Sequence, residues 1–521
     1  MTHVRNLIIG AGPAGLQLAH LLAKSGAEYL VLERGASAGT FFHSYPRHDR
    51  LLSINKVHTG YPDLESRRRY DWNALVCDDE ALQFREFSKE YFPTASSLVE
   101  YLEKFAAHYN LSISYGCSVT KVTKTEDGFG VALEDGRRFT CERLFVATGI
   151  PTAHRPDIEG VDLCENYDEF SVDPNDFVDQ RVFIAGKGNS AFETADALIE
   201  TTRKIWVCGR STVKLAWASH YVGHLRAVNN NFLDTYQLKA QNNILDGQLR
   251  AVKKAEDGTG LVAEVWFESR QQLLSYPCDR VLLCTGFASD LGIFDESCTP
   301  QRRECGRLPL MTCEWESVNV PNMFFVGTLM QSRDYRKTMS AFIHGFRHNI
   351  ESLVSILDKR DGTGAWVDRQ PLPPAGDGMA AALIERMSTS AALMLQPGFL
   401  ADVVVPSADG GPGKFEHMRD VPVDYVTEKL LSEESELYML TLEYGESDQY
   451  MDPFAMPRGV GVAEDFYIHP IIRRYKGGEV VDRFFLPDDL DNDWRGNLEY
   501  VDQLAKWLRA GPSQPQQGAA E

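Results

Sequence analysis

The stretch Asn6-Leu-Ile-Ile-Gly-Ala-Gly-Pro-Ala-Gly15 decides the fold of this chain. A short apolar run of β type leads directly into a Gly-x-Gly-x-x-Gly turn. In such a unit Gly10 makes the tight turn, Gly12 lets the backbone approach a pyrophosphate, and Gly15 lets helix and strand pack closely. The following helix offers free N–H groups and a partial positive charge to phosphates. The stretch therefore predicts a dinucleotide-binding βαβ unit.

The residues downstream complete this fingerprint. The apolar spacing of Leu16–Leu22 is helical, and Glu28–Glu33 forms a second strand ending in an acid. We expect the Glu33 carboxylate to accept hydrogen bonds from the adenosine ribose hydroxyls. The residues predicted to contact this nucleotide are Gly10, Gly12, Pro13, Ala14, Gly15, Glu33 and Arg34.

Three later segments identify the nucleotide as FAD rather than NAD. The fingerprint starts within ten residues of the N-terminus, and apolar strands ending in glycine follow at Arg143–Gly149, Arg280–Gly286 and Met323–Gly327. A helical stretch runs from Lys337 to Leu357. This order is typical of two-dinucleotide flavoproteins. It adds to the predicted cofactor contacts Thr148, Gly149, Thr285, Gly286, Gly327 and Ser340.

A second nucleotide site follows the strand Arg181–Ala185, where the turn reads Gly186-Lys-Gly-Asn-Ser-Ala191. Alanine replaces the third glycine, which the fingerprint permits. The next strand, Lys204–Val207, ends in no acid and leads to Arg210, whose charge suits a 2′-phosphate. We therefore predict NADPH; the alternative is a solvated Arg210 and no preference between NADPH and NADH. The predicted contacts are Gly186, Gly188, Asn189, Ser190, Arg210 and Ser211.

These motifs predict an α/β, two-dinucleotide-binding-domain flavoprotein. A Rossmann-like FAD domain is interrupted by a Rossmann-like NADPH domain, and an additional C-terminal region follows. The predicted boundaries are 1–165 for the first part of the FAD domain (with an insertion at 40–92), 175–278 for the NADPH domain, 279–370 for the second part of the FAD domain, 375–508 for a C-terminal cap or interaction region, and 509–521 for a disordered tail.

The composition of the chain argues against several classes of binding partner. The formal charge of −21 argues against nucleic-acid binding, because phosphate backbones need clustered Lys and Arg. The sequence contains no uninterrupted run of about 18 apolar residues, so we predict no membrane-spanning helix. The ten cysteines form no C-x-x-C pair, which is typical of free thiols in a reducing compartment, and the histidines lie at no metal-ligand spacing. We expect a cytoplasmic enzyme with no metal.

Several long motifs carry a family resemblance. The chain resembles the endoplasmic-reticulum flavoprotein associated with degradation, of the FAD-dependent oxidoreductase domain-containing family. The matching segments are Ser44–Lys56, Tyr70–Asn73, Tyr91–Pro93, Gly186–Ala195, Trp217–Asn230, Asp334–Lys337 and Phe342–Arg347. We recognise no segment in this sequence that resembles that family's signal peptide or retention sequence, and therefore do not expect its lumenal role here.

The layout is more distantly similar to class B flavin monooxygenases, whose L-x-x-N segment is matched by Leu51–Asn55. This resemblance implies that Asn55 hydrogen-bonds near the reactive edge of the flavin. Arg47 and His48 are the other catalytic candidates. Arg47 either pairs with a flavin or NADP phosphate or has a structural role at the surface.

We predict an NADPH-dependent FAD monooxygenase of specialised metabolism that uses O2 and a small molecule, by N-oxygenation or Baeyer–Villiger insertion through a flavin hydroperoxide. The alternatives are an oxidase or dehydrogenase without oxygen transfer, a thiol/disulfide reductase, which the lack of a cysteine pair disfavours, and a non-catalytic flavin-binding protein. A homodimer through 375–508 is a further alternative to a cap.

Two more segments are expected near the reaction. Trp217–Asn231 forms either a substrate wall or interface packing and turns. Phe342–Arg347 starts the helix whose N-terminus faces the flavin pyrimidine ring, and Asp334, Arg336 and Lys337 line the same cleft.

Overall fold

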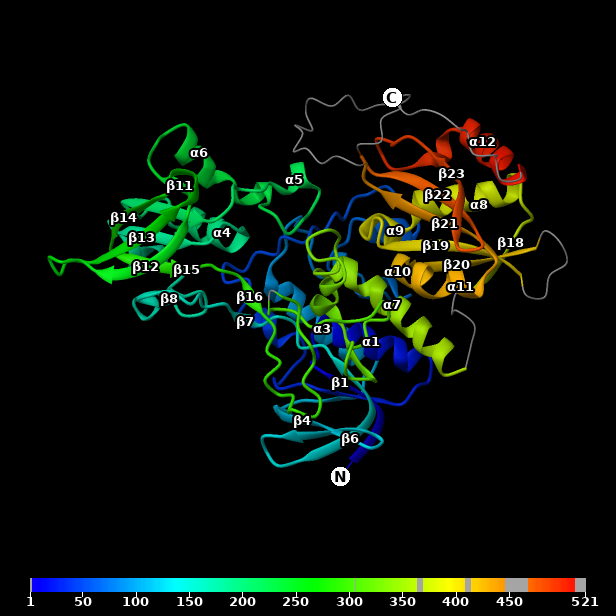
Figure 1. Ribbon diagram of the computed structural model, residues 1–521, viewed down its shortest axis with the longest axis horizontal. Helices are drawn as coiled ribbons and strands as arrows, with labels where there is room; N and C mark the ends of the chain where they lie inside the picture. The colour runs from blue at the N-terminus through cyan, green and yellow to red at the C-terminus, as the bar shows by residue number, and fades with distance from the viewer. Residues whose placement is uncertain (1, 305, 363–368, 408–413, 446–466, 511–521) are drawn as a thin grey trace. The chain divides into compact units, whose positions relative to one another are not determined.

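The computed structural model describes residues 2–304, 306–362, 369–407, 414–445 and 467–510 (Figure 1). Within it the chain divides into two compact units, each described by itself. The first unit comprises Met1–Thr40, Ser53–Gly149 and Leu291–Glu521, and the second comprises Phe41–Leu52 and Ile150–Asp290.

The first unit contains a seven-stranded sheet built around the predicted N-terminal strand. β1 (Thr2–Ile9) pairs in parallel with β2 and β6, so that Ile9 lies opposite Leu32 on one side and Val146 on the other. The order is β3-β2-β1-β6-β5-β4, and β17 also pairs with β6. The remaining strands are β2 (Tyr29–Leu32), β3 (Ile113–Ser114), β4 (Val119–Thr125), β5 (Gly128–Leu133), β6 (Arg138–Val146) and β17 (Met323–Phe325).

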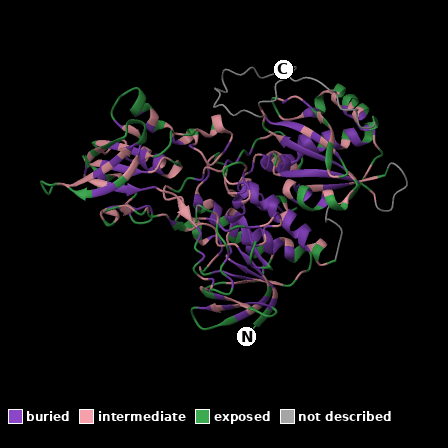
Figure 2. Ribbon diagram, in the orientation of Figure 1, coloured by how far each residue is buried: buried purple, intermediate pink, exposed green. Residues whose placement is uncertain are grey.

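Helices of this unit pack on the sheet through apolar faces. α1 (Pro13–Lys24) lies beside α3 (Ala95–His108) and α7 (Ile343–Arg360) (Figure 1). α2 (Leu64–Arg68) lies in the insertion. α7 is buried along most of its length (Figure 2). It begins at Ile343 rather than at Lys337, because the preceding residues form an irregular turn in which Arg336 has a positive φ of 61°.

The second unit holds the predicted NADPH domain. Its five-stranded parallel sheet has the order β11-β10-β9-β15-β8, a three-stranded antiparallel sheet has the order β12-β13-β14, and β7 pairs with β16. Its elements are β7 (Thr152–Ala153), β8 (Glu165–Asn166), β9 (Arg181–Ala185), α4 (Asn189–Leu198), β10 (Lys204–Gly209), α5 (Ala216–Ser219), α6 (Asn231–Gln237), β11 (Asn243–Asp246), β12 (Gln248–Lys254), β13 (Leu261–Phe267), β14 (Gln272–Cys278), β15 (Arg280–Leu283) and β16 (Phe287–Ala288).

The boundaries differ from the predicted ones. β15 was expected to resume the FAD domain after residue 278, but it pairs with β9 in the sheet of the second unit. β8 (Glu165–Asn166), which lies at the predicted end of the first part of the FAD domain, pairs with β15 in the same sheet. Apolar strands that end in Thr-Gly occur in both Rossmann-like sheets, so the motif alone does not say which sheet a strand joins. The segment Phe41–Leu52, expected within the FAD domain, also belongs to the second unit.

The C-terminal region is part of the first unit and has its own six-stranded sheet, in the order β18-β20-β19-β21-β22-β23. α8 and α12 cover the face that presents Tyr438, Leu440 and Leu442. The elements are β18 (Gln370–Leu372), α8 (Asp377–Thr389), α9 (Ala391–Leu395), β19 (Leu400–Pro406), β20 (Phe415–Pro422), α10 (Val423–Tyr425), α11 (Leu431–Glu433), β21 (Glu436–Glu443), β22 (His469–Lys476), β23 (Glu479–Phe485) and α12 (Leu498–Arg509).

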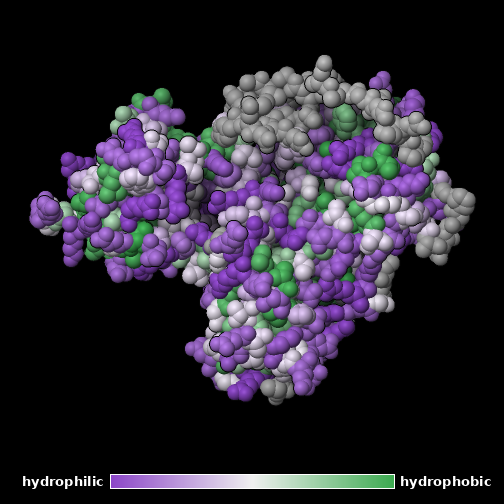
Figure 3. Space-filling model, in the orientation of Figure 1, coloured by the Kyte–Doolittle hydropathy of each residue, from purple (hydrophilic) through white to green (hydrophobic). Residues whose placement is uncertain are grey.

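The chain end and the surface complete the fold. The expected tail begins inside α12, which extends to Arg509, and residues 511–521 lie outside the described residues. None of the helices in the described ranges combines the length and hydropathy needed to cross a bilayer. The face drawn in Figure 3 is mainly hydrophilic, with apolar residues in small separate groups.

Candidate active site

The first glycine turn has the geometry that its three glycines require. A Cβ on Gly10, where φ is 108°, would lie 2.7 Å from the Ala147 carbonyl oxygen, and one on Gly15 would lie 1.9 Å from the Gly10 carbonyl oxygen. A Cβ on Gly12 would meet no atom within 4 Å. Gly10 and Gly15 are therefore required for the packing of strand and helix, whereas the space at Gly12 is open to a ligand.

The start of α1 suits a phosphate. Its first turn contains no acidic residue, Pro13 occupies the first helical position, and no side chain caps the N-terminus. The first helical hydrogen bond runs from the Leu16 N–H to the Gly12 carbonyl at 3.0 Å, so the earlier N–H groups have no partner within the helix. This arrangement fits the pyrophosphate of FAD.

The Glu33 side chain stabilises the first glycine turn through hydrogen bonds. It is buried, and its carboxylate accepts hydrogen bonds from the Ala11 N–H (2.7 Å), the Gly35 N–H (2.8 Å) and the Thr40 hydroxyl (3.0 Å). A carboxylate has about four acceptor sites, so one is left for a ribose hydroxyl. The predicted ribose contact remains a prediction, and the neighbouring Arg34 is exposed.

The start of α7 is linked to this turn through the segment after β17. A Cβ on Gly327 would lie 2.5 Å from the Ala14 Cβ, and the Thr328 hydroxyl donates to the Ala341 carbonyl at 3.2 Å. α7 begins two residues later, without a side-chain cap and without an acid in its first turn. Its N-terminus can therefore stabilise negative charge on a ligand held at the glycine turn.

Several polar atoms of the first unit are buried without a protein partner in the described structure. Among them are Asn55 Oδ1, Thr148 Oγ1 and Asp334 Oδ1, which belong to residues or segments expected near the flavin. The Asn55 amide nitrogen is already engaged, because it donates to the carbonyls of Ser88 (2.8 Å) and Glu90 (3.2 Å). Acceptors of this kind fit the N–H and hydroxyl donors of a flavin and its ribityl chain.

Arg47 and His48 lie in the second unit, whereas Asn55 lies in the first. The Arg47 guanidinium donates to the Tyr167 carbonyl at 2.5 Å and lies 5.1 Å from the centre of the Phe170 ring. Burial, and then the charge of Arg47, lower the pKa of His48, so this imidazole is neutral at pH 7. The catalytic set predicted from sequence is thus divided between the two units.

The second glycine turn repeats the geometry of the first. A Cβ on Gly186 would lie 2.0 Å from the Cys284 carbonyl oxygen, whereas one on Gly188 would meet nothing within 4 Å. α4 starts at Asn189 with no acid in its first turn. The residues after β10 fit a 2′-phosphate, because Arg210 and Ser211 are exposed and the Arg210 guanidinium forms no ion pair within the described residues.

The Asn189 side chain has a different task from the predicted phosphate contact. It donates to the His224 carbonyl at 2.8 Å and to the Gly223 carbonyl at 3.4 Å, and it accepts from the Arg226 N–H at 2.9 Å and the Asn229 amide at 3.2 Å. All four of its hydrogen-bonding sites are used. Asn189 therefore fixes the Trp217–Asn231 segment to the glycine turn, and only its backbone N–H is left for a phosphate.

Other predicted contacts have structural partners. The Thr285 hydroxyl donates to the His154 carbonyl, and Gly286 accepts from the His154 N–H at 2.8 Å. Ser340 is fully buried and accepts hydrogen bonds from Asn349 and Gln396. Gly149 and Gly286 both have positive φ, at 65° and 87°. Their contact with a cofactor stays a prediction.

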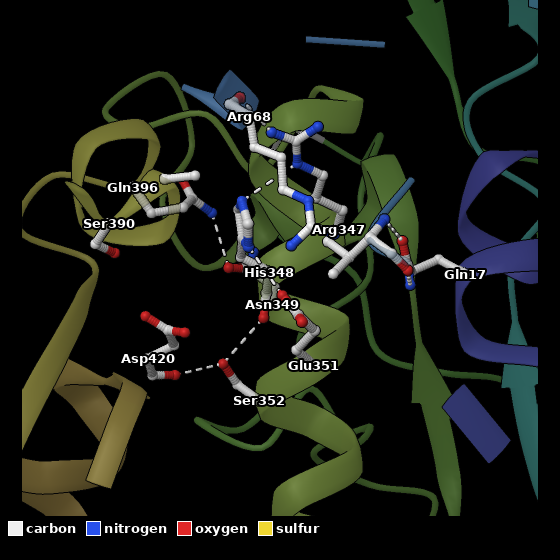
Figure 4. Close-up of polar contacts among 12 residues, drawn as sticks. Gln17, Arg68, Arg347, His348, Asn349, Glu351, Ser352, Ser390, Gln396 and Asp420 are labelled. Atoms are coloured by element: carbon white, nitrogen blue, oxygen red, sulfur yellow. Dashed lines mark hydrogen bonds and ion pairs between the residues drawn. The ribbon is translucent and has the colours of Figure 1, made fainter. Parts of the chain in front are cut away.

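Sequence reasoning missed the role of Arg347, which anchors the insertion. This fully buried guanidinium donates to the carbonyls of Arg68 (2.8 Å), Asp71 (2.9 Å) and Ala74 (2.7 Å). Figure 4 shows Arg347 beside Arg68. Burial lowers its pKa to about 10, so it stays charged at neutral pH. A cluster of Arg, His and Asn within a helix expected to be buried was the available signal.

Comparison with known proteins gives the family. Residues 7–327 match the model described as pyridine nucleotide-disulphide oxidoreductase. A mouse protein, FAD-dependent oxidoreductase domain-containing protein 2, is 35% identical over an alignment of 511 positions that covers 90% of this chain and 76% of the mouse protein. The chain belongs to the pyridine nucleotide-disulphide oxidoreductase family. It is an FAD-dependent oxidoreductase.

Solved structures similar to this oxidoreductase share its fold. A flavin-containing monooxygenase from Stenotrophomonas maltophilia superposes with a TM-score of 0.54 at 17% identity, covering 70% of the oxidoreductase and 100% of that chain. A bacillithiol disulfide reductase from Staphylococcus aureus has a TM-score of 0.52 at 20% identity, covering 69% and 99%. These two names describe different reactions, so the fold does not select the chemistry.

Proposed function

We propose that this oxidoreductase is an NADPH-dependent monooxygenase acting on a small molecule. The observation that favours monooxygenation over disulfide reduction is the burial of the cysteine thiols. All nine described cysteines are buried, and burial raises the pKa of Cys141, Cys208 and Cys284 to about 12. Disulfide exchange needs a thiolate, which such thiols supply poorly at neutral pH.

Bound FAD would accept a hydride from NADPH and activate O2. The chain's own residues bind and orient. The N-termini of α1 and α4 bind the two pyrophosphates, Arg210 binds the 2′-phosphate, and the Asn55 amide oxygen accepts a hydrogen bond beside the flavin. No side chain of the protein needs to form a covalent bond with the substrate.

The deciding experiment measures whether an oxygen atom from O2 is incorporated into the product. Purified holoenzyme is supplied with NADPH and ¹⁸O2 in the presence of panels of amines, ketones and sulfides. Substrate-stimulated NADPH oxidation with one ¹⁸O atom in the product supports the proposal. NADPH oxidation that yields only H2O2 with every panel indicates an oxidase and contradicts it, and NADPH-dependent reduction of a disulfide probe would restore the reductase alternative.

The preference for NADPH is tested at Arg210. Arg210→Ala is expected to raise KM for NADPH by about 10- to 100-fold, since charged hydrogen bonds are worth about 1.5–3 kcal/mol. KM for NADH should not change, because NADH carries no 2′-phosphate. Steady-state kinetics with both nucleotides measures this.

The matched control is Arg203→Ala, an exposed arginine just before the other end of β10. It should leave both KM values unchanged. Equal effects of the two substitutions on NADPH, or an equal rise of both KM values in Arg210→Ala, would contradict the assignment of the 2′-phosphate to Arg210.

A further inference from the structure

A buried glutamine of the C-terminal region reaches the turn that precedes α7. Gln396 follows α9 and is fully buried. Its amide nitrogen donates to Ser340 Oγ (2.9 Å) and Asn349 Oδ1 (2.8 Å), and its amide oxygen accepts from the Met339 N–H (2.9 Å). Figure 4 shows Gln396 directed at α7 beside Asn349. One side chain thus joins the turn and the helix at three points.

The network continues from Ser340 to the buried carboxylate of Asp334. Ser340 Oγ also accepts from the Asn349 amide at 2.8 Å. The Ser340 N–H donates to the same carboxylate at 3.2 Å, and the Thr338 hydroxyl donates to it as well. The turn from Asp334 to Ser340 is therefore held by a connected set of hydrogen bonds, which has Gln396 at its far end.

This turn determines where α7 begins. A Cβ on Gly345, in the first turn of α7, would lie 2.0 Å from the Met339 carbonyl oxygen, so helix and turn are in close backbone contact. A movement at Met339 must therefore move the first turn of α7. Gln396 is itself held in place, because its N–H bonds to the Ala392 carbonyl, and the Ala391 N–H at the other end of α9 donates to Glu65 of α2 (2.9 Å).

We infer that Gln396 is a positioning residue for the flavin, through which the C-terminal region fixes the turn 334–340 and the N-terminus of α7. The inference rests on the proposed placement of that N-terminus at the flavin. A fixed N-terminus presents its N–H groups to the negative charge that develops on flavin reduction. The C-terminal region, which begins after the residues matched by the family model, then contributes to the cofactor site instead of acting as a separate cap.

The test compares Gln396→Met with the control Ser352→Ala. Methionine is close to glutamine in size and makes none of its hydrogen bonds. Ser352 also joins α7 to the C-terminal region, by donating to the Asp420 carbonyl at 2.6 Å (Figure 4). It lies nine residues after Ile343, the first residue of α7, and therefore about 13 Å along the helix from its start. The control thus removes a hydrogen bond between the same two parts of the chain at a point remote from the turn.

Amide hydrogen exchange on the FAD-free protein is the first readout, because it needs no cofactor. Gln396→Met should speed exchange in residues 334–346, whereas Ser352→Ala should not. The second readout is FAD itself. Gln396→Met should raise the FAD dissociation constant about tenfold, or about 1.4 kcal/mol, and make the flavin reduction potential more negative, with both values unchanged in Ser352→Ala.

Gln396→Glu adds a pH profile that a merely structural loss would not produce. A buried glutamate is neutral at low pH and can then donate one hydrogen bond, so its FAD affinity relative to the natural protein should recover as the pH falls, whereas that of Gln396→Met should not. Unchanged exchange in 334–346 overturns the inference. Faster exchange with unchanged FAD affinity and potential also overturns it, and neither result depends on whether oxygen is transferred.

Discussion

Gly15→Ala is expected to destabilise the FAD-free protein by about 3 kcal/mol, because the new Cβ would lie 1.9 Å from the Gly10 carbonyl oxygen and the backbone of strand or helix must move. Gly12→Ala should leave the same stability unchanged or slightly raised. Its Cβ meets nothing within 4 Å, and Gly12 has φ −77° in an extended conformation that alanine adopts without strain. Thermal unfolding of the FAD-free proteins measures both.

For FAD binding, we expect the substitution at Gly12 to have the large effect that the substitution at Gly15 has on stability. Gly12→Ala is expected to weaken FAD binding at least about a hundredfold, or about 2.7 kcal/mol, because the methyl group fills the space assigned to the pyrophosphate. Isothermal titration of folded, FAD-free protein gives the dissociation constant. Normal FAD affinity in Gly12→Ala would show that the pyrophosphate lies elsewhere.

Asp402→Asn should destabilise the first unit by about 3–5 kcal/mol, the usual result of removing one partner from a buried ion pair. Asp402 is fully buried and accepts from the Arg386 Nε (2.7 Å), from His417 Nε2 (2.8 Å) and from the Asp420 N–H (3.1 Å). The variant leaves the Arg386 charge with less compensation. Urea unfolding at pH 7, followed by circular dichroism, measures the difference.

The pH dependence of this difference has a definite sign. Burial alone would raise the pKa of Asp402, but the charge of Arg386 and the contact with His417 hold that pKa well below its ordinary range. The carboxylate therefore contributes its full stabilisation above the unfolded-state pKa of about 3.9, and loses it as the pH falls further. The gap between the natural protein and Asp402→Asn should be constant from about pH 5 to 8 and narrow below about pH 4.

The control is Asp135→Asn, at an exposed ion pair with Arg137 in the hairpin between β5 and β6. This substitution should produce no measurable change, since exposed pairs contribute little. A loss in Asp402→Asn no larger than that in Asp135→Asn would mean that the buried cluster does not stabilise the C-terminal region.

Local patterns predicted much of the fold. The runs before Gly10 and Gly186 became β1 and β9, the helices that follow became α1 and α4, and the strand ending near Gly327 became β17 on β6. β1, α1, β9 and α4 depend on contacts between near neighbours in sequence, namely strand, turn and helix start. The spacing of the glycines in the sequence is therefore enough to predict the backbone conformation of each turn.

Assignments that depend on distant partners were harder to predict. The strand Arg280–Leu283 has the same apolar pattern as β6, and only its pairing with β9 places it in the second unit. Phe41–Leu52 lies within the FAD-domain sequence, yet Arg226 donates to the Leu52 carbonyl at 2.7 Å and Arg47 to Tyr167, both in the second unit. No local pattern encodes these partners.

The sequence by itself determined the two glycine turns, and with them the family of the protein, because a tight turn and an open approach each require glycine, and a close packing requires glycine or alanine, at a fixed spacing. Only the tertiary structure decided what the polar residues do. Asn189 and Gln396 are both amides, and their roles follow from partners 34 or more residues away. A buried amide must satisfy its donors and acceptors wherever the fold brings them, and residue type alone does not specify where that is.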